Sequence, residues 1–414
     1  MVMPLTKTLV HWLAVITIAC SVSACAVLPR HPLPPELMSE ASIRGMPDVR
    51  ALAGAPNAAM ERDFELSMTQ QSDADFPKDA DGAIRYPHLA LSGGGAVGAF
   101  GAGFLEGWTE TGRRPTFKIV TGVSTGALMA PFAFLGPQYD ERLRRFYTQT
   151  TSREIFKPIS VLTALLRRES LAQTTPLEEL IRNTIDAPLL AKIAEAHRHG
   201  RRLYMGTVNL DNRRFVVWNM GLIATYQNQA ALELFRRVML ASASVPIAFP
   251  PVLFQVEANG QTYDEMHVDG FVIANVFVLG SIFSPSEIYS RHGDGRGRED
   301  IFIVHNGKLT VEPSATERSL RGIALRSIEV AGWSGIVGDL FREFAFARRD
   351  NAGFHWVTIA EGTPLPESLE FNPEEMLKLY EVGREDAKAG PEWRLWPPGM
   401  RGDRNQGSPA STTR

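Results

Sequence analysis

The chain has 414 residues, of which 44% are hydrophobic and 21% are charged, so it is long enough to bury a large core. Its formal net charge of −3 gives no indication of a nucleic-acid-binding protein. Both cysteines, Cys20 and Cys25, lie near the N-terminus, which excludes a cysteine nucleophile, a thiolate metal site or a disulfide in the rest of the chain.

The first 24 residues are typical of an export signal. An apolar run, Leu9–Ala19, follows Lys7 and is shorter than a typical membrane-spanning helix. The segment Val22-Ser23-Ala24-Cys25 resembles the bacterial lipobox, in which cleavage leaves a lipid-modified cysteine. We therefore expect Cys25 to be lipidated and the protein to be an exported lipoprotein on a membrane surface, at the outer-membrane or periplasmic side. A plain secretory signal with an incidental cysteine is the alternative.

Residues 25–85 are expected to form a leader that tethers the anchor to the rest of the protein. The Pro-rich segment His31–Pro35 predicts a stiff, extended start, and short helices are expected near 39–43 and 58–68. At the other end, residues 397–414 contain few apolar side chains and are expected to be a disordered tail.

Residues 86–396 are expected to form one catalytic body in which strands alternate with helices. Strands are predicted over 87–91 and 117–120, and each is followed by a glycine-containing turn and a helix, over 97–109 and 125–135. This order predicts an α/β fold with a mainly parallel sheet between layers of helices. Further helices are expected over 175–185, 188–197, 228–242, 316–347 and 373–388, and further strands over 202–208, 214–218, 253–257, 261–264, 300–305 and 354–360.

The turn Gly122-Val123-Ser124-Thr125-Gly126 offers a nucleophile between the second predicted strand and its helix. Gly122 and Gly126 remove the Cβ atoms that would crowd such a turn, and the helix that follows directs its positive end toward Ser124. The position therefore favours a serine hydroxyl that attacks a carbonyl carbon.

The first strand ends in Ser92-Gly93-Gly94-Gly95-Ala96-Val97-Gly98, which supplies backbone N–H groups without obstructing side chains. The amides of Gly93, Gly94 and Gly95 are suited to an oxyanion or a phosphate. The spacing of Gly93, Gly95 and Gly98 also occurs in dinucleotide-binding folds, but the next strand lacks the acidic residue that such folds place at its end.

Two kinds of group could activate Ser124. The downstream histidines, which a Ser-His-Asp triad would require, are His267, His292, His305 and His355. Asp269, in His267-Val268-Asp269-Gly270, could instead act directly as the base, provided that burial raises its pKa from the ordinary value near 4. Residue chemistry alone leaves both possibilities open.

The ordered motifs resemble those of the patatin-like phospholipase family over residues 86–283. They are the glycine stretch 93–98, the serine turn 122–126, the segment 241–251 and the pair Asp269-Gly270. The resemblance implies a three-layer α/β fold and a Ser124–Asp269 dyad without histidine. It also implies an oxyanion hole from Gly93 to Gly95 and a lipid ester substrate. From the residues themselves we expect neither a metal nor a cofactor.

Two positions depart from the family pattern. Val97 stands where the family often has Arg or Lys, and Phe271 stands where it usually has Gly or Ala. Phe271 could narrow the acyl site or shift Asp269. An α/β-hydrolase-type esterase with a histidine triad and a non-catalytic lipoprotein that binds ligands are the alternative functions.

Overall fold

The computed structural model describes residues 28–400 except 73, 159–169, 171, 293, 294, 311 and 312. The expected signal peptide, Cys25 and positions 401–414 of the expected tail lie outside the described residues. Within the described ranges, no helix combines the length and apolar character needed to cross a membrane.

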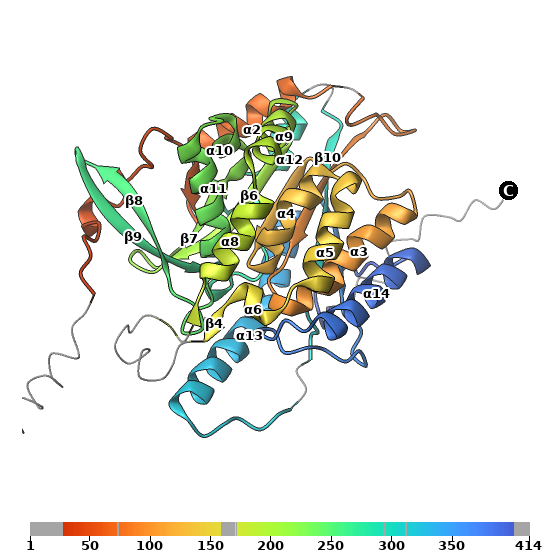
Figure 1. Ribbon diagram of the computed structural model, residues 1–414. Helices are drawn as coiled ribbons and strands as arrows, with labels where there is room; N and C mark the ends of the chain where they lie inside the picture. Colours follow the sequence, from red (N-terminus) through yellow and green to blue (C-terminus); the bar gives the residue numbers. More distant parts are fainter. Residues whose placement is uncertain are drawn as a thin grey trace, which may run out of the picture.

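A mixed sheet, nine-stranded within the described residues, forms the centre of the molecule (Figure 1). Its main path runs in the order β1-β7-β6-β3-β2-β10-β11, and the central strands β6, β3, β2, β10 and β11 are mutually parallel. These strands are β1 (Arg50–Leu52), β2 (Ile84–Leu91), β3 (Ile119–Val123), β6 (Arg202–Asn209), β7 (Arg214–Asn219), β10 (Gly297–His305) and β11 (Gly353–Thr358). The mainly parallel sheet agrees with the expectation from the sequence.

The strands β8 (Val252–Ala258) and β9 (Gln261–Asp269) form a hairpin that extends away from the body, on the left in Figure 1. Asn259 and Gly260 both have positive φ, as a tight two-residue hairpin turn requires. At its inner end, β9 joins the sheet by pairing antiparallel to β6.

Helices cover both faces of the sheet because successive side chains of a strand point to opposite sides. In β2, Leu89 and Leu91 join the core of one face, whereas Ala90 joins the core of the other. The first face is covered by α3 (Ala99–Glu110), α4 (Thr125–Leu135), α5 (Asp140–Gln149), α8 (Thr175–Thr184), α9 (Ala187–Arg198), α10 (Met220–Thr225), α11 (Gln229–Ser242) and α14 (Pro373–Ala389). The second is covered by α2 (Ala58–Gln70), α12 (Pro285–Arg291) and α13 (Leu320–Arg349).

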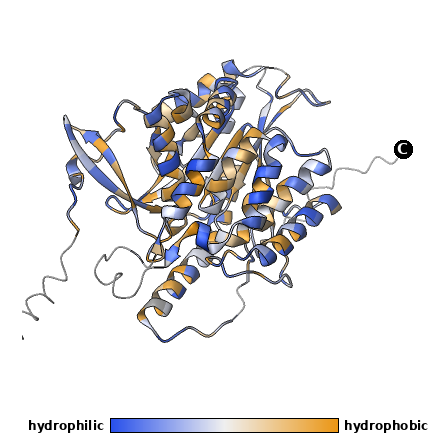
Figure 2. Cartoon of the chain, viewed as in Figure 1, coloured by the Kyte–Doolittle hydropathy of each residue, from blue (hydrophilic) through white to orange (hydrophobic). Residues whose placement is uncertain are grey.

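The remaining elements are short. They are α6 (Ser152–Ile155), the two-stranded pair β4 (Lys157–Pro158) and β5 (Ala172–Gln173), and the 3₁₀ turns η1 (Pro35–Leu37), η2 (Gly95–Gly98), η3 (Pro137–Tyr139), η4 (Gly270–Val272) and η5 (Leu279–Ser281). In the hydropathy view, the apolar ribbon of α4, the helix that directly follows Ser124, lies in the middle of the molecule (Figure 2).

The described part of the leader packs against the body. Its strand β1 pairs with β7 at the edge of the sheet, and Met60 and Phe64 of α2 are fully buried. The carboxylate of Asp63 in α2 pairs with Arg202 of β6. Residues 50–70 therefore pack as part of the folded body, although the sequence analysis assigned them to the tether; the helix expected near 58–68 is observed as α2.

Candidate active site

The ends of two strands meet beside β6. The last residue of β3, Val123, pairs with Gly206, and the last residue of β9, Asp269, pairs with the next residue, Thr207. β3 runs parallel to β6 and β9 runs antiparallel to it, so their C-terminal ends face each other along the same edge. This arrangement brings Ser124 and Asp269 together although they are far apart in sequence.

Ser124 occupies a strained turn between β3 and α4. Its backbone has φ 56° and ψ −126°, a conformation that non-glycine residues rarely adopt and that holds the side chain away from both elements. A methyl group added at Gly122 would lie 2.4 Å from the Gly126 carbonyl oxygen, and one at Gly126 would lie 2.3 Å from the Leu91 carbonyl oxygen. The turn therefore requires glycine at both flanking positions.

The C-terminal end of α11 and the residues directly after it hold both candidate residues in place. Ser242 Oγ accepts the Ser124 N–H at 3.0 Å and donates to the Gly206 carbonyl at 2.7 Å. The Asp269 N–H donates to the Ser244 carbonyl at 2.9 Å. Sequence reasoning gave these two serines no role, although the segment 241–251 that contains them carries part of the family resemblance.

The Asp269 side chain is completely buried. Its Oδ1 accepts the Phe271 N–H at 3.0 Å. Burial raises the pKa of the carboxyl group to about 7, against the smaller lowering effects of the Phe271 N–H and of the Ser124 hydroxyl.

The approach of the Ser124 hydroxyl to Asp269 is loose. The hydroxyl favours the charged form of the Asp269 carboxyl group, but no described group makes a well-formed hydrogen bond to Asp269 Oδ2. Catalytic hydrogen bonds often tighten only when a substrate is bound. A methyl group at Gly270 would lie 2.8 Å from both the Gly206 carbonyl oxygen and Val123 Cγ1, so glycine is needed directly after Asp269.

The glycine stretch lies against Ser124. A methyl group at Gly93 would come within 3.2 Å of Ser124 Cβ. The Gly93 N–H donates to the Asn275 carbonyl at 3.1 Å. It is therefore not free to bind an oxyanion, contrary to the expectation from the sequence. Within the described ranges, the N–H groups of Gly94 and Gly95 donate to no other group and remain available.

Neighbouring side chains hold this loop in place. Asn306 Nδ2 donates to the Ser92 carbonyl at 3.0 Å, and Asn306 Oδ1 accepts the Gly101 N–H at 3.0 Å. A methyl group at Gly94, where φ is +154°, would lie 2.4 Å from the Asn306 carbonyl oxygen. Gly98 is equally constrained, because a methyl group there would lie 2.6 Å from Thr125 Oγ1.

Within the described residues, none of the four candidate histidines hydrogen-bonds to Ser124 or Asp269. His305 Nδ1 lies 3.2 Å from Ser92 Oγ, and burial lowers the pKa of His305 to about 4. The partners of the others are Thr207 and Glu265 for His267, the Ile288 carbonyl for His292, and Asp300 for His355. This arrangement supplies no histidine base to Ser124. The described residues also contain no group of three or more His, Cys, Asp or Glu side chains that could hold a metal ion.

Both departures from the family pattern have structural settings. Val97 is buried in the core of the first face, where it packs as an apolar side chain. The Phe271 ring lies against α13, because a methyl group at Gly332 would meet it at 2.9 Å. The Phe271 backbone nevertheless serves the site, since its N–H binds Asp269.

Residues 89–281, which contain the serine turn, the glycine stretch and Asp269, match the family model described as patatin-like phospholipase. Residues 89–281 are thus similar to a patatin-like phospholipase domain. The match extends from β2 to η5, so it includes the strand ends that form this patatin-like site.

Several solved structures resemble this chain at low identity. VipD from Legionella pneumophila is 13% identical with a TM-score of 0.36, over 76% of this chain and 69% of VipD. The type III effector ExoU, from Pseudomonas aeruginosa, is 14% identical with a TM-score of 0.35, over 75% of this chain and 55% of ExoU. Human GIVD cytosolic phospholipase A2 is 13% identical with a TM-score of 0.31, over 76% of this chain and 52% of that enzyme. The chain thus spans about half the length of the last two proteins, and it matches no curated protein.

Proposed function

We propose that this protein is a serine lipid acyl hydrolase that cleaves carboxylic esters of lipids with a Ser124–Asp269 dyad. The observation that carries the proposal is the meeting of these two residues at the opposed ends of β3 and β9, beside the free amides of Gly94 and Gly95. The patatin-like phospholipase match supports the substrate class.

The proposed reaction has two steps. Asp269 takes the hydroxyl proton while Ser124 Oγ attacks the ester carbonyl, and the negative charge on the carbonyl oxygen is stabilised by the N–H groups of Gly94 and Gly95. The tetrahedral intermediate collapses to an acyl-enzyme as the alcohol leaves with the proton. Water, deprotonated by Asp269, then attacks the acyl group, and the fatty acid leaves as Ser124 recovers its proton.

The environment of Asp269 suits the role of a base. An ordinary carboxylate is a weak base toward a hydroxyl group, and a pKa near 7 makes Asp269 a stronger one while still leaving much of it charged at neutral pH. The positive end of α4 favours the negative charge that develops beside Ser124.

Two substitutions test this function. Ser124→Ala and Asp269→Asn should each lower kcat on a lipid ester panel by about 10⁴-fold or more, with circular dichroism unchanged. Ser290→Ala, at an exposed serine of α12, is the matched control and should retain full activity. Near-full turnover by either site variant would rule out the dyad.

We also propose that the enzyme is exported and held on a membrane surface by lipid on Cys25, on the strength of its lipobox-like sequence. Incorporation of labelled fatty acid into the wild-type chain, lost in Cys25→Ala, is the expected result. Equal labelling of both chains would exclude this anchor.

A further inference from the structure

Three ionisable side chains share one face of β9. Glu265, His267 and Asp269 alternate along the strand, so all three point to the same side of the sheet. All three are nearly or completely buried. β9 pairs with β6 at only three positions, from Asn209↔His267 to Thr207↔Asp269. Besides this short pairing, the Asp269 N–H is held by the Ser244 carbonyl, and side-chain interactions along β9 add to this support.

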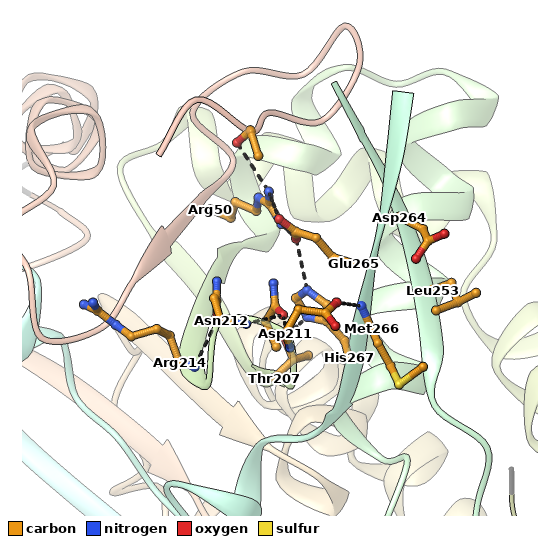
Figure 3. A network of polar contacts seen from close by, with 12 residues as sticks. Arg50, Thr207, Asp211, Asn212, Arg214, Leu253, Asp264, Glu265, Met266 and His267 are labelled. Atoms are coloured by element: carbon orange, nitrogen blue, oxygen red, sulfur yellow. Dashed lines mark hydrogen bonds and ion pairs between the residues drawn. The ribbon is translucent and has the colours of Figure 1, made fainter. Parts of the chain in front are cut away.

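A chain of polar contacts links the leader to this face (Figure 3). Both oxygens of Glu265 accept hydrogen bonds from the Arg50 guanidinium of β1, one of them at 3.1 Å. Glu265 Oε2 lies 3.3 Å from His267 Nε2, and His267 Nδ1 lies 2.9 Å from Thr207 Oγ1. The indole N–H of Trp218 donates to the same Thr207 oxygen at 2.9 Å.

The contacts are compatible with an arrangement of protons in which His267 is neutral. The Trp218 indole can only donate, so the Thr207 hydroxyl accepts from it and is free to give its own proton to His267 Nδ1. His267 then carries its proton on Nε2 and donates to the Glu265 carboxylate. Every group from Arg50 to Trp218 is satisfied when His267 is neutral and Glu265 is charged.

The electrostatics of the buried groups agree with this arrangement. Burial lowers the pKa of His267, which favours the neutral ring. Burial alone would raise the pKa of Glu265, but His267 and Arg50 outweigh it and lower the pKa to about 2. A charged carboxylate at this depth requires its cation, because an unpaired buried charge is strongly destabilising.

The chain of contacts ends beside the catalytic candidate, since Thr207 is the residue of β6 that pairs with Asp269. We propose that Arg50 is a positioning residue for Asp269, holding the inner end of β9 against β6 through Glu265, His267 and Thr207. The proposal rests on the proposed function and extends the machinery of the site to the leader, which lies outside the family match.

Arg50→Met tests the proposal in the full chain. Its kcat should fall by about 10- to 100-fold with KM nearly unchanged, because misplacing a base slows the chemical step. The matched control is Arg44→Met, which removes another leader-to-hairpin ion pair, that of exposed Arg44 with Glu257. The control should leave kcat unchanged.

A second variant separates positioning from loss of folding. Arg50→Met/Glu265→Gln removes both charges, so no unpaired charge is left against β9. It should recover at least about tenfold of the lost kcat, since the side-chain carbonyl that Glu265→Gln introduces can still accept the His267 proton. Further loss of kcat in the double variant would overturn the proposal.

Hydrogen exchange provides a measurement that does not depend on activity. The Asp269 N–H, bonded to Ser244, should exchange faster in Arg50→Met than in wild type or Arg44→Met, while the amides of β2 stay protected. If Arg50→Met shows this local change but the wild-type protein hydrolyses no ester, the proposed function is wrong and the structural link from Arg50 to Asp269 stands. Unchanged exchange at Asp269, or faster exchange throughout the sheet, would overturn the positioning role.

Discussion

The buried carboxyl group of Asp269 combines two properties that seldom occur together. It has no exposed surface, yet it must carry a charge to act as a base. Burial raises its pKa to about 7, so it changes charge within the range where an enzyme operates.

The pH dependence of turnover follows from this pKa. The base is active only when deprotonated, so kcat/KM should rise with pH and reach half its plateau near pH 7. Ester hydrolysis measured from pH 5 to pH 9, over a range in which the fold is intact, checks the expectation. A rate that stays flat down to pH 5 would contradict it.

Stability should change in the opposite direction. Because the folded-state pKa is raised above the unfolded one, Asp269 binds its proton more tightly in the folded protein, and stability falls as pH rises from about 4 to about 7. Asp269→Asn removes this effect. As pH rises above 7, the free energy of unfolding of the variant should therefore increase relative to that of wild type by up to about 4 kcal/mol. Urea titrations of both proteins at pH 5 and pH 8 measure the difference.

The sequence indicated candidate residues for the site but not their hydrogen bonds. Ser124, Asp269 and the glycine stretch could be found because each is marked by local turn chemistry. The bond from Gly93 to Asn275 and the support from Ser242 could not, because their partners lie far along the chain and only the fold brings them together.

At the scale of elements, α13 supports the site from the second face of the sheet. Asp339 Oδ2 accepts the N–H groups of Asn275 and Val276 at 2.6 and 3.3 Å, and Glu343 accepts the Val278 N–H at 3.3 Å. The Asn275 carbonyl in turn accepts the Gly93 N–H. A helix far along the chain thus fixes the segment between η4 and η5, which in turn contacts the glycine stretch.

Removing one of these carboxylates should affect stability and turnover together. Asp339→Ala leaves two buried N–H groups without their acceptor, which should lower the free energy of unfolding by about 2–4 kcal/mol and reduce kcat as well. Denaturant unfolding and ester turnover measure both effects. Glu329→Ala, which breaks only an exposed ion pair with Arg326 on the same helix, should change stability by less than about 0.5 kcal/mol. Equal behaviour of the two variants would show that α13 does not support the site.

The elements next to the serine were predicted closely, whereas β9 was not. The helix expected over 125–135 is observed with those bounds. The strand expected to end at 264 continues to Asp269, because Glu265 and His267 lie on its buried face. Ionisable residues at such positions do not resemble a core strand until their partners Arg50 and Thr207 are known.

At the scale of the whole molecule, the leader is joined to the body by buried charges. Asp63 of α2 accepts hydrogen bonds from the Arg202 guanidinium, which is completely buried, and from Asn219. Burial alone would raise the pKa of Asp63, but the hydrogen bond from His197 and the charge of Arg202 lower it. The sequence could not show this, because pairing between the leader and the sheet is a long-range property.

Loss of this contact should unfold the protein more easily. Asp63→Ala leaves Arg202 without its carboxylate and should lower the free energy of unfolding by about 3–5 kcal/mol. Glu61→Ala, on the same helix, removes only an exposed pair with Arg291 and should have little effect. Thermal and denaturant unfolding of both variants decide the matter, and a similar small effect of both would show that α2 is dispensable.

The bond between the Ser124 N–H and Ser242 also limits how a substrate can be oriented. Since that amide is occupied, it is not available to charge on a substrate carbonyl oxygen, which in the proposed reaction is met by Gly94 and Gly95. A planar carbonyl with its oxygen held on that side presents one prochiral face to Ser124 Oγ. In the proposed reaction, the alkoxy group then leaves in one fixed direction relative to the main chain.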